Sequence, residues 1–316
     1  MRSPTVSLVA LLIAVAPAHA WNAIGHKMTA EIAFNQFSPE RQQRITAVLR
    51  AHPRFEQDFT AAMPDEVAGG SETEQAIWMI RRASIWPDLV PHVSESVRRR
   101  YHRGTWHYVN LPIYLTEHDA ASLDGQLDHN MSLQFEPPLQ QNLNVVQALQ
   151  GNLAVWQDQS AANADKAVAL CWILHLTGDL HQPLHTVALF SRGHFPAGDR
   201  GGNDIRIDRS PRPTNLHAVW DSLPNEFADL TPSASTLATL ADDVVTIDSP
   251  AAWLLRHYEL ALEFAYTPGL KADLQVGLAK GAAAAMTLNE AYRSRAGAIA
   301  KEQVIMAGHR IAALLE

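Results

Sequence analysis

The segment from Cys171 to His185 constrains the fold of this chain more than any other stretch. Within it, His175 and Asp179 stand four residues apart on a predicted helix over 164–179. Side chains at this spacing share one helix face about 6 Å apart, so they can grip one divalent ion, or the carboxylate can bridge two. Pro183 ends the helix, and His185 follows on a loop that lets it point back at a neighbouring metal. The segment therefore predicts a helix that carries metal ligands.

A second pair with the same spacing, His217 and Asp221, follows the predicted helix cap Asn215. A lone helical histidine is usually a packed or surface residue. Two such pairs among apolar and aromatic residues would be costly to bury unless they bind metal or pair with each other. Nitrogen and oxygen donors without thiolate favour catalytic zinc over manganese or iron. The single cysteine, Cys171, is predicted to be a small buried residue and not a nucleophile.

Helical patterns dominate the chain and predict an all-α, single-domain fold. Apolar residues recur every four positions from Ile24 to Ile32, and serine caps open several later helices. We expect further helices from Ser38, over 71–84, over 139–157, over 164–179 with Asn163 as cap, over 249–265, and from 274 to the C-terminus. One alternating run, Ile205–Asp208, follows a glycine turn and predicts at most a small β-hairpin near residues 200–210.

The first twenty residues have the pattern of a secretory signal peptide. Arg2 is followed by an apolar run over 6–16 and by Ala18-His19-Ala20, which suits a signal peptidase. The run is too short for a membrane anchor, which needs about 18 apolar residues. We expect cleavage before Trp21, leaving residues 21–316 as one catalytic domain in a secreted or periplasmic protein.

The chain is acidic, with a formal net charge of −8 that the loss of Arg2 makes more negative. Such a charge argues against passive binding of nucleic acid through a basic surface. A function that handles phosphate therefore needs another source of positive charge, and bound metal is the obvious one.

Three upstream fragments each offer a further ligand: His26 near the predicted new N-terminus, Asp88 after Trp86-Pro87, and His107 after Trp106. Each is weak when taken alone. Taken in chain order with the segments above, they make the sequence resemble the zinc-dependent single-strand nucleases of fungal and plant type, the S1/P1 nuclease family, in a bacterial-like form. The zinc-dependent phospholipases C share its superfamily. The resemblance runs from Trp21 to Asp221 and continues more loosely to the C-terminus.

The resemblance implies three zinc ions per chain. The first would bind Asp88, His107, His175 and Asp179; the second His185, His217 and Asp221; and the third His26, the bridging Asp179, and the free amine and carbonyl oxygen of Trp21. A hydroxide held between zinc ions by Asp179 and Asp88 would attack phosphorus, giving 5′-phosphorylated products. Tyr108 stands where the family places an aromatic ring near the reacting phosphodiester, and Asn203 matches a Gly-Gly-Asn turn near its nucleobase pocket. A hairpin turn with no ligand contact is the alternative interpretation of that segment.

Two positions depart from the family pattern. Pro91 stands where relatives often carry a phosphate-neutralising arginine, and Asn110 stands where an acid is expected. Four nearby arginines could substitute, although a solvated basic helix face explains them as well: Arg98, Arg99, Arg100 and Arg103. Both departures bear on substrate preference more than on reaction type.

The resemblance thus implies an endonuclease acting on single-stranded DNA and RNA, with nucleotides as products, working as a monomer with no stable protein partner and no membrane association. 3′-Nucleotides and duplexes are further possible substrates. Two alternatives stay open. A phospholipase C would more usually have glutamate at the position of Asp221, and a non-catalytic periplasmic zinc-binding protein would usually carry a His-rich loop, which this chain lacks.

Overall fold

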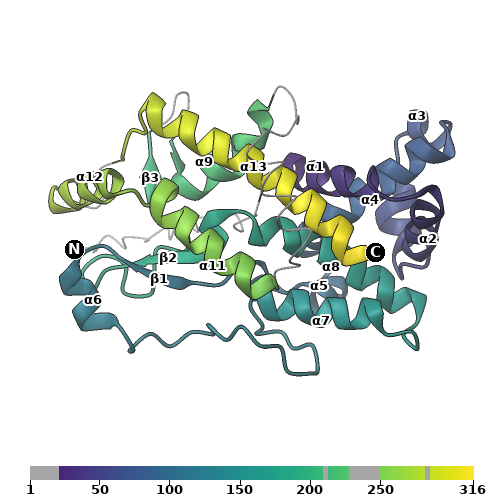
Figure 1. The fold of residues 1–316 in the computed structure, drawn as a ribbon, viewed down its shortest axis with the longest axis horizontal. Coiled ribbons are helices and arrows are strands. Elements are labelled where there is room, and N and C mark those ends of the chain that lie inside the picture. The colour runs from purple at the N-terminus through teal and green to yellow at the C-terminus, as the bar shows by residue number, and fades with distance from the viewer. Residues whose placement is uncertain (1–20, 209–212, 228–248, 282–284) are drawn as a thin grey trace, which may run out of the picture.

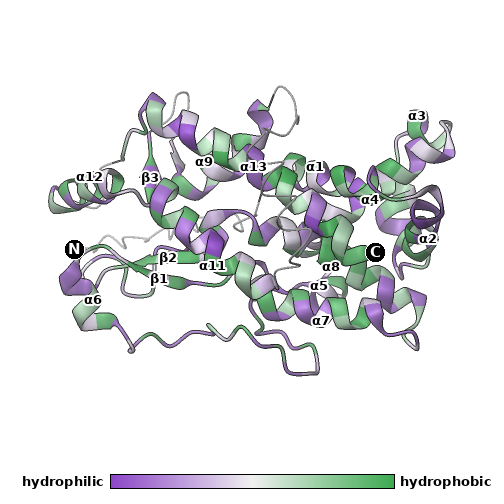
Figure 2. Ribbon diagram, in the orientation of Figure 1, coloured by the Kyte–Doolittle hydropathy of each residue, from purple (hydrophilic) through white to green (hydrophobic). Residues whose placement is uncertain are grey.

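Helix α8 (Asn163–Leu180) lies at the centre of the computed structural model, which describes residues 21–208, 213–227, 249–281 and 285–316. Every residue from Ala169 to Leu180 is buried, and α8 is largely green in the hydropathy view (Figure 2). A helix that is apolar on all sides must be covered on all sides. The covering helices surround it in Figure 1: α1 (Ala23–Phe34), α2 (Pro39–Arg50), α4 (Glu72–Leu89), α7 (Val145–Gln157), α11 (Pro250–Leu260) and α13 (Glu290–Leu315).

The other described α-helices are α3 (Asp65–Ala68), α5 (Glu95–Tyr101), α6 (Glu117–Leu123), α9 (Leu216–Ser222) and α12 (Pro268–Ala279). The mostly helical architecture confirms the predicted fold class. None of the described helices combines the length and apolar character needed to cross a bilayer. The predicted signal peptide lies outside the described residues.

Two small sheets interrupt the helices. Strand β1 (Leu111–Tyr114) runs parallel to β2 (Val187–Phe190), with Leu111 opposite Val187, and this pair was not predicted. All residues of β2 are buried, so its sequence lacks the alternation that marks a half-exposed strand. The predicted hairpin is present in reduced form: β3 (Arg206–Ile207) pairs antiparallel with β4 (Thr214–Asn215).

Several predicted helix starts are confirmed. Ser38 caps α2, Ser71 and Glu74 form a capping box on α4, and Asn215 caps α9 through the backbone N–H of Ala218. The predicted cap Asn163 is wrong, because α8 begins after Ala162 without a side-chain cap.

Other boundaries also differ from the prediction. Helix α4 continues beyond Ser84 to Leu89 with Pro87 inside it, because residues 83–87 are buried in the core and packing outweighs the missing proline N–H. Helix α7 starts only after Asn144, which makes its own capping box. The expected C-terminal helix is two helices, α12 and α13, and α11 passes at Leu260 into a π-helical turn.

Candidate metal centre

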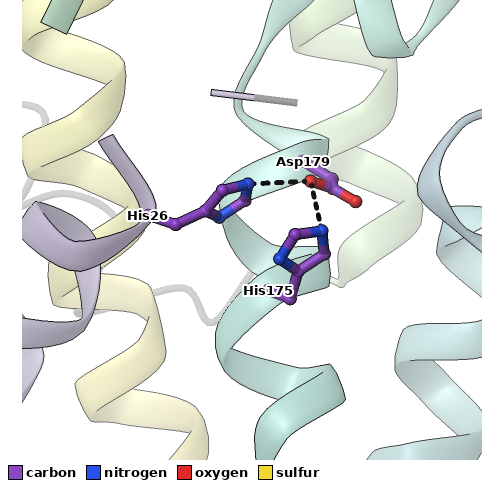
Figure 3. A group of neighbouring side chains, drawn as sticks. All are labelled: His26, His175 and Asp179. Carbon is purple, nitrogen blue, oxygen red and sulfur yellow. Dashed lines mark ion pairs between the residues drawn. The ribbon is translucent and has the colours of Figure 1, made fainter. Parts of the chain in front are cut away.

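The last two turns of α8 place His175 and Asp179 in the interior, where neither side chain is exposed. The Nδ1–H of His175 donates to the carbonyl oxygen of Ser84 on α4, at 2.8 Å. This bond fixes the tautomer and leaves the lone pair on Nε2, which lies 3.4 Å from Oδ1 of Asp179. The predicted pair therefore shares one face of the helix and points inward (Figure 3).

His26 reaches the same point from α1. Its ring stacks on that of His175 with 4.0 Å between centroids, and its Nε2 lies 3.3 Å from Oδ1 of Asp179 (Figure 3). A Cβ at Gly178 would lie 2.6 Å from Nδ1 of His26, so the close approach of α1 to α8 depends on glycine there. Both ring nitrogens of His26 and Oδ1 of Asp179 are buried without a hydrogen bond. Buried polar atoms without partners are costly, and a shared cation would satisfy them.

A second donor group consists of Asp88, His107 and His175, whose ligand atoms all lie within 4.8 Å of one another. Asp88 comes from the last turn of α4, and His107 ends a short 3-10 helix over Gly104–His107. Nδ1 of His107 lies 3.0 Å from Nε2 of His175 and 3.0 Å from Oδ2 of Asp179. Asp179 therefore adjoins both groups, one through each carboxylate oxygen.

A third group joins His185, His217 and Asp221. Nδ1–H of His185 donates to the carbonyl of His107 at 2.6 Å, and Nδ1–H of His217 donates to the carbonyl of Gly201 at 2.7 Å. Each ring can therefore offer an Nε2 lone pair; these two nitrogens lie 3.0 Å apart, and Oδ2 of Asp221 lies 3.5 Å from Nε2 of His217. Two facing lone pairs beside a carboxylate suit a metal cation, and histidine ligands usually donate their second N–H to a carbonyl in this way.

Burial and neighbouring charges shift the pKa values of several donor residues. Burial raises the pKa of Asp221 well above its usual range, and the negative charges of Asp179 and Asp88 act in the same direction. Burial lowers the pKa of His175 to about 3, so this ring is neutral at physiological pH, as a metal ligand must be. Burial tends to raise the pKa of Asp179 as well, but the neighbouring histidines hold it well below its usual value.

The predicted N-terminal residue, Trp21, is fully buried and packs with the core side chains around Leu184 and Trp220. The backbone N–H of the next residue, Asn22, donates to the carbonyl of Asp221 at 3.1 Å. The start of α1 is therefore attached directly to α9, which carries two of the predicted ligands.

Sequence reasoning missed Gln182, which supports the site from outside the ligand set. It is fully buried, its Nε2 donates to Oδ1 of Asp221 at 2.9 Å, and its Oε1 accepts from the N–H of Leu184 at 2.7 Å. One amide thus orients Asp221 and shapes the turn that leads to His185. The one signal in the sequence is its place in the segment between Asp179 and His185.

A cavity of about 270 Å³ opens onto the donor groups and brings the predicted substrate residues beside them. Tyr108, with 38% of its surface exposed, and Asn203 both line it, together with Asp88 and His185. Asn203 belongs to a turn over residues 199–204, and its Nδ2 donates to the carbonyl of Arg200 at 2.8 Å. Six of the predicted site residues line this cavity: Asp88, His107, Tyr108, His185, Asn203 and His217. His175 and Asp221 share donor groups with these lining residues, and His26 and Asp179 share a donor group with His175.

Comparison with known proteins identifies the family of this chain. Endonuclease 2 of Arabidopsis thaliana is 24% identical over 315 residues, covering 96% of this chain and 92% of that protein. Endonuclease 5 of the same plant is 26% identical and covers 71% of this chain and 62% of its own length. Nuclease S1 of Aspergillus oryzae is 34% identical over a shorter segment, 27% of this chain and 26% of that protein. The sequence profile described as S1/P1 Nuclease matches residues 21–316, and the chain therefore belongs to the S1/P1 nuclease family.

Proposed function

We propose that this nuclease is a zinc-dependent endonuclease that hydrolyses single-stranded DNA and RNA to 5′-phosphorylated products, using three Zn²⁺ per chain. One observation carries the proposal: three neighbouring groups of mostly buried histidine and aspartate donors lie together, and two of them contribute residues to a cavity that also exposes an aromatic ring. Nitrogen and oxygen donors without thiolate suit catalytic zinc.

The proposed ligands follow the three donor groups. Asp88, His107, His175 and Asp179 would hold the first ion; His185, His217 and Asp221 the second; and His26, Asp179 and the amine and carbonyl oxygen of Trp21 the third. When bound, zinc supplies Lewis-acid charge to phosphoryl oxygens and lowers the pKa of coordinated water. It also supplies the positive charge that an acidic chain otherwise lacks.

The chain's own residues would bind and orient the substrate. The exposed ring of Tyr108 could stack on a base. Asn203 lines the same cavity, where its amide could form a hydrogen bond with that base. A base can stack on a side chain only when it is unstacked from its helix, so the ring favours single strands. Backbone carbonyls orient the rings of His185 and His217 through hydrogen bonds. These rings would therefore reorient little when they bind metal.

We further propose that residues 1–20 are a signal peptide and that residues 21–316 act as one secreted or periplasmic domain. The family match that begins at Trp21 supports this boundary. The buried position of Trp21 beside α9 supports a structural role for the new N-terminus.

The principal test combines a zinc count with activity assays on the processed protein. We expect about three zinc ions per chain, cleavage of single-stranded DNA and RNA, and complete loss of cleavage with chelator. Phosphatidylcholine serves as the competing substrate, because its hydrolysis in place of nucleic acid would indicate a phospholipase C. A count of one zinc or none would contradict the trinuclear arrangement.

A second test concerns the amine of Trp21. An extra glycine before Trp21 converts this amine to an amide, which is a poor zinc donor at neutral pH. We expect the extended protein and His26→Ala to lose the same zinc ion, so that combining them adds little. Full zinc content and full rate in the extended protein would exclude Trp21 as a ligand.

A further inference from the structure

Pro91 lines the cavity beside the donor groups and offers no charge to a bound phosphate. Among the described residues on that lining, Arg200 is the one with a permanent positive charge. We propose that Arg200 binds the non-bridging oxygens of a substrate phosphate and so supplies the cation that Pro91 cannot. This inference rests on the proposed phosphodiesterase function.

The four arginines near α5 do not fill this role in the structure. Arg98 and Arg99 both pair with Glu95 on an exposed helix face. The guanidinium of Arg103 donates to the carbonyls of Arg100 and His102, at 2.8 Å each. None of the four lines the cavity.

The backbone at Arg200 is fixed in an unfavourable conformation. Its φ of +55° is the one left-handed value at a non-glycine residue in the described part of the chain. Glycine or asparagine would adopt this conformation more easily, so the backbone does not explain an arginine here. A strained residue at the edge of a site is a reason to look for a role of its side chain.

The turn that carries Arg200 is anchored to the metal centre. The carbonyl of Gly201 accepts the hydrogen bond from His217, and a Cβ at Gly201 would lie 2.3 Å from the carbonyl oxygen of Leu184. Asn203 holds the carbonyl of Arg200 through its Nδ2. The position of Arg200 relative to the donor groups is therefore set by the same contacts that orient a proposed ligand.

The guanidinium of Arg200 has a partner that phosphate can displace. Its Nη2 lies 2.7 Å from Oδ1 of Asp204, and the two side chains are 54% and 39% exposed. Nε of Arg200 also donates to both carboxylate oxygens of Asp204, at 3.2 Å each. An ion pair this exposed contributes little stability, and a guanidinium can bind phosphate with the same bidentate geometry. Asp204 thus holds the side chain at the cavity edge until a substrate phosphate replaces it.

The test compares Arg200→Gly, which also suits the backbone, with Arg200→Lys, which keeps the charge. The matched control is Arg99→Ala, which removes the same charge from an exposed pair outside the cavity. With zinc content equal to wild type, we expect Arg200→Gly to lower kcat/KM on a single-stranded oligonucleotide by about 10-fold to 100-fold. The slope of log kcat/KM against log salt should become shallower by about 0.7, the value for one phosphate contact on a single strand. Arg200→Lys should retain part of the activity, and the control should stay within about twofold of wild type.

Binding of thymidine 5′-phosphate to the zinc-loaded protein, measured by calorimetry, gives a readout that needs no cleavage. It should weaken in Arg200→Gly and strengthen slightly in Asp204→Asn, which removes the competing carboxylate. An Arg200→Gly protein with wild-type kcat/KM and salt slope would overturn the inference. Loss of zinc in this variant would also overturn it, because the residue would then act through the turn. If wild type cleaves no nucleic acid but Arg200→Gly still weakens nucleotide binding, the proposed function fails and the inference stands.

Discussion

Asp179 is the residue on which the donor groups converge. His26, His107 and His175 each place a ring nitrogen within 3.4 Å of one of its oxygens. These three histidines come from three different parts of the chain, so a single carboxylate connects α1, α8 and the segment before β1. A residue in this position can serve two metal sites at once.

Replacing Asp179 by asparagine should therefore abolish hydrolysis. A neutral amide cannot bridge two cations, and the expected loss is about 10³-fold or more in rate. Steady-state cleavage of single-stranded DNA, with zinc content measured in parallel, checks this. Asp128→Asn, on an exposed loop, is the control and should behave as wild type. Activity of Asp179→Asn within tenfold of wild type would mean that Asp179 is not the bridge.

Gln182 contacts the donor groups indirectly, through its hydrogen bond to Asp221. Gln182→Met keeps the approximate volume but removes the hydrogen bond to Asp221, and groups that orient ligands typically affect metal affinity or activity by about 10-fold to 100-fold. Competition with a calibrated chelator measures the zinc affinity. Gln43→Met on the exposed face of α2 is the control. Unchanged zinc affinity would show that Asp221 keeps its position without the amide.

At the scale of elements, the contact between α1 and α8 decides whether His26 reaches Asp179. Gly178→Ala would push a Cβ against the His26 ring and should destabilise the fold by about 1–3 kcal/mol while releasing zinc. Gly297→Ala on α13 is the matched control, because a Cβ there meets nothing within 4 Å. The control should gain about 0.5–1 kcal/mol. Urea denaturation measures the unfolding free energy of both variants. Equal changes in the two variants would show that the α1–α8 interface can accommodate an extra methyl group.

The turn over residues 199–204 is anchored by the buried Asp199, which accepts hydrogen bonds from the Tyr266 hydroxyl at 2.6 Å and the Leu189 N–H at 2.8 Å. Burial raises the pKa of Asp199 from 3.8 to about 6, although these hydrogen bonds oppose the rise. Because the folded pKa is the higher one, the stabilising contribution of Asp199 is complete below pH 3.8 and is lost as the pH rises through about 6.

Asp199→Asn should remove this pH dependence, since asparagine does not ionise. Relative to wild type, the variant should gain about 2 kcal/mol in unfolding free energy between pH 4 and pH 8. Denaturant titrations of both proteins at the two pH values, with equal zinc, measure the difference. A difference that does not change with pH would show that Asp199 ionises at its ordinary pKa in the folded protein.

For the molecule as a whole, bound metal would provide the stability that disulfides give other exported proteins. It would also provide the positive charge that a basic surface gives other nucleic-acid-binding proteins. The one cysteine is buried and free, and the proposed ligands come from segments that span residues 21 to 221. Metal bound to such distant segments stabilises only the folded chain. The acidic net charge of −8 leaves nucleic-acid binding dependent on the same ions.

Removal of zinc should therefore lower both Tm and affinity for single-stranded DNA. Each site filled at about 1,000 times its Kd contributes about 4 kcal/mol to stability. Thermal denaturation with and without chelator, and binding measured before and after zinc is restored, check both effects. Asp179→Asn should show a smaller response to zinc. A chelated protein with wild-type Tm and binding would mean that the donor groups hold their positions without metal.

Features that depend on spacing over a few residues could be predicted from the sequence. Side-chain caps predict the helix starts at Ser38, Ser71 and Asn215. The four-residue spacing predicts that His175 and Asp179 share one helix face. The resemblance to the nuclease family, carried by motifs in chain order, supplied the grouping of the ligands. Their role as ligands stays a prediction, although their side chains do lie together.

The tertiary structure alone decided what depends on packing between distant segments. Three such features leave no periodic signal in the sequence: the parallel pair β1–β2, the continuation of α4 through Pro87, and the hydrogen bond from Gln182 to Asp221. The proposed role of Arg200 also depends on tertiary structure, because the folded turn places it at the cavity. The arginines of α5 do not line the cavity, and Arg99 pairs with Glu95 instead. Caps and periods act over a few residues, whereas the position of a side chain in a cavity is the sum of contacts made far along the chain.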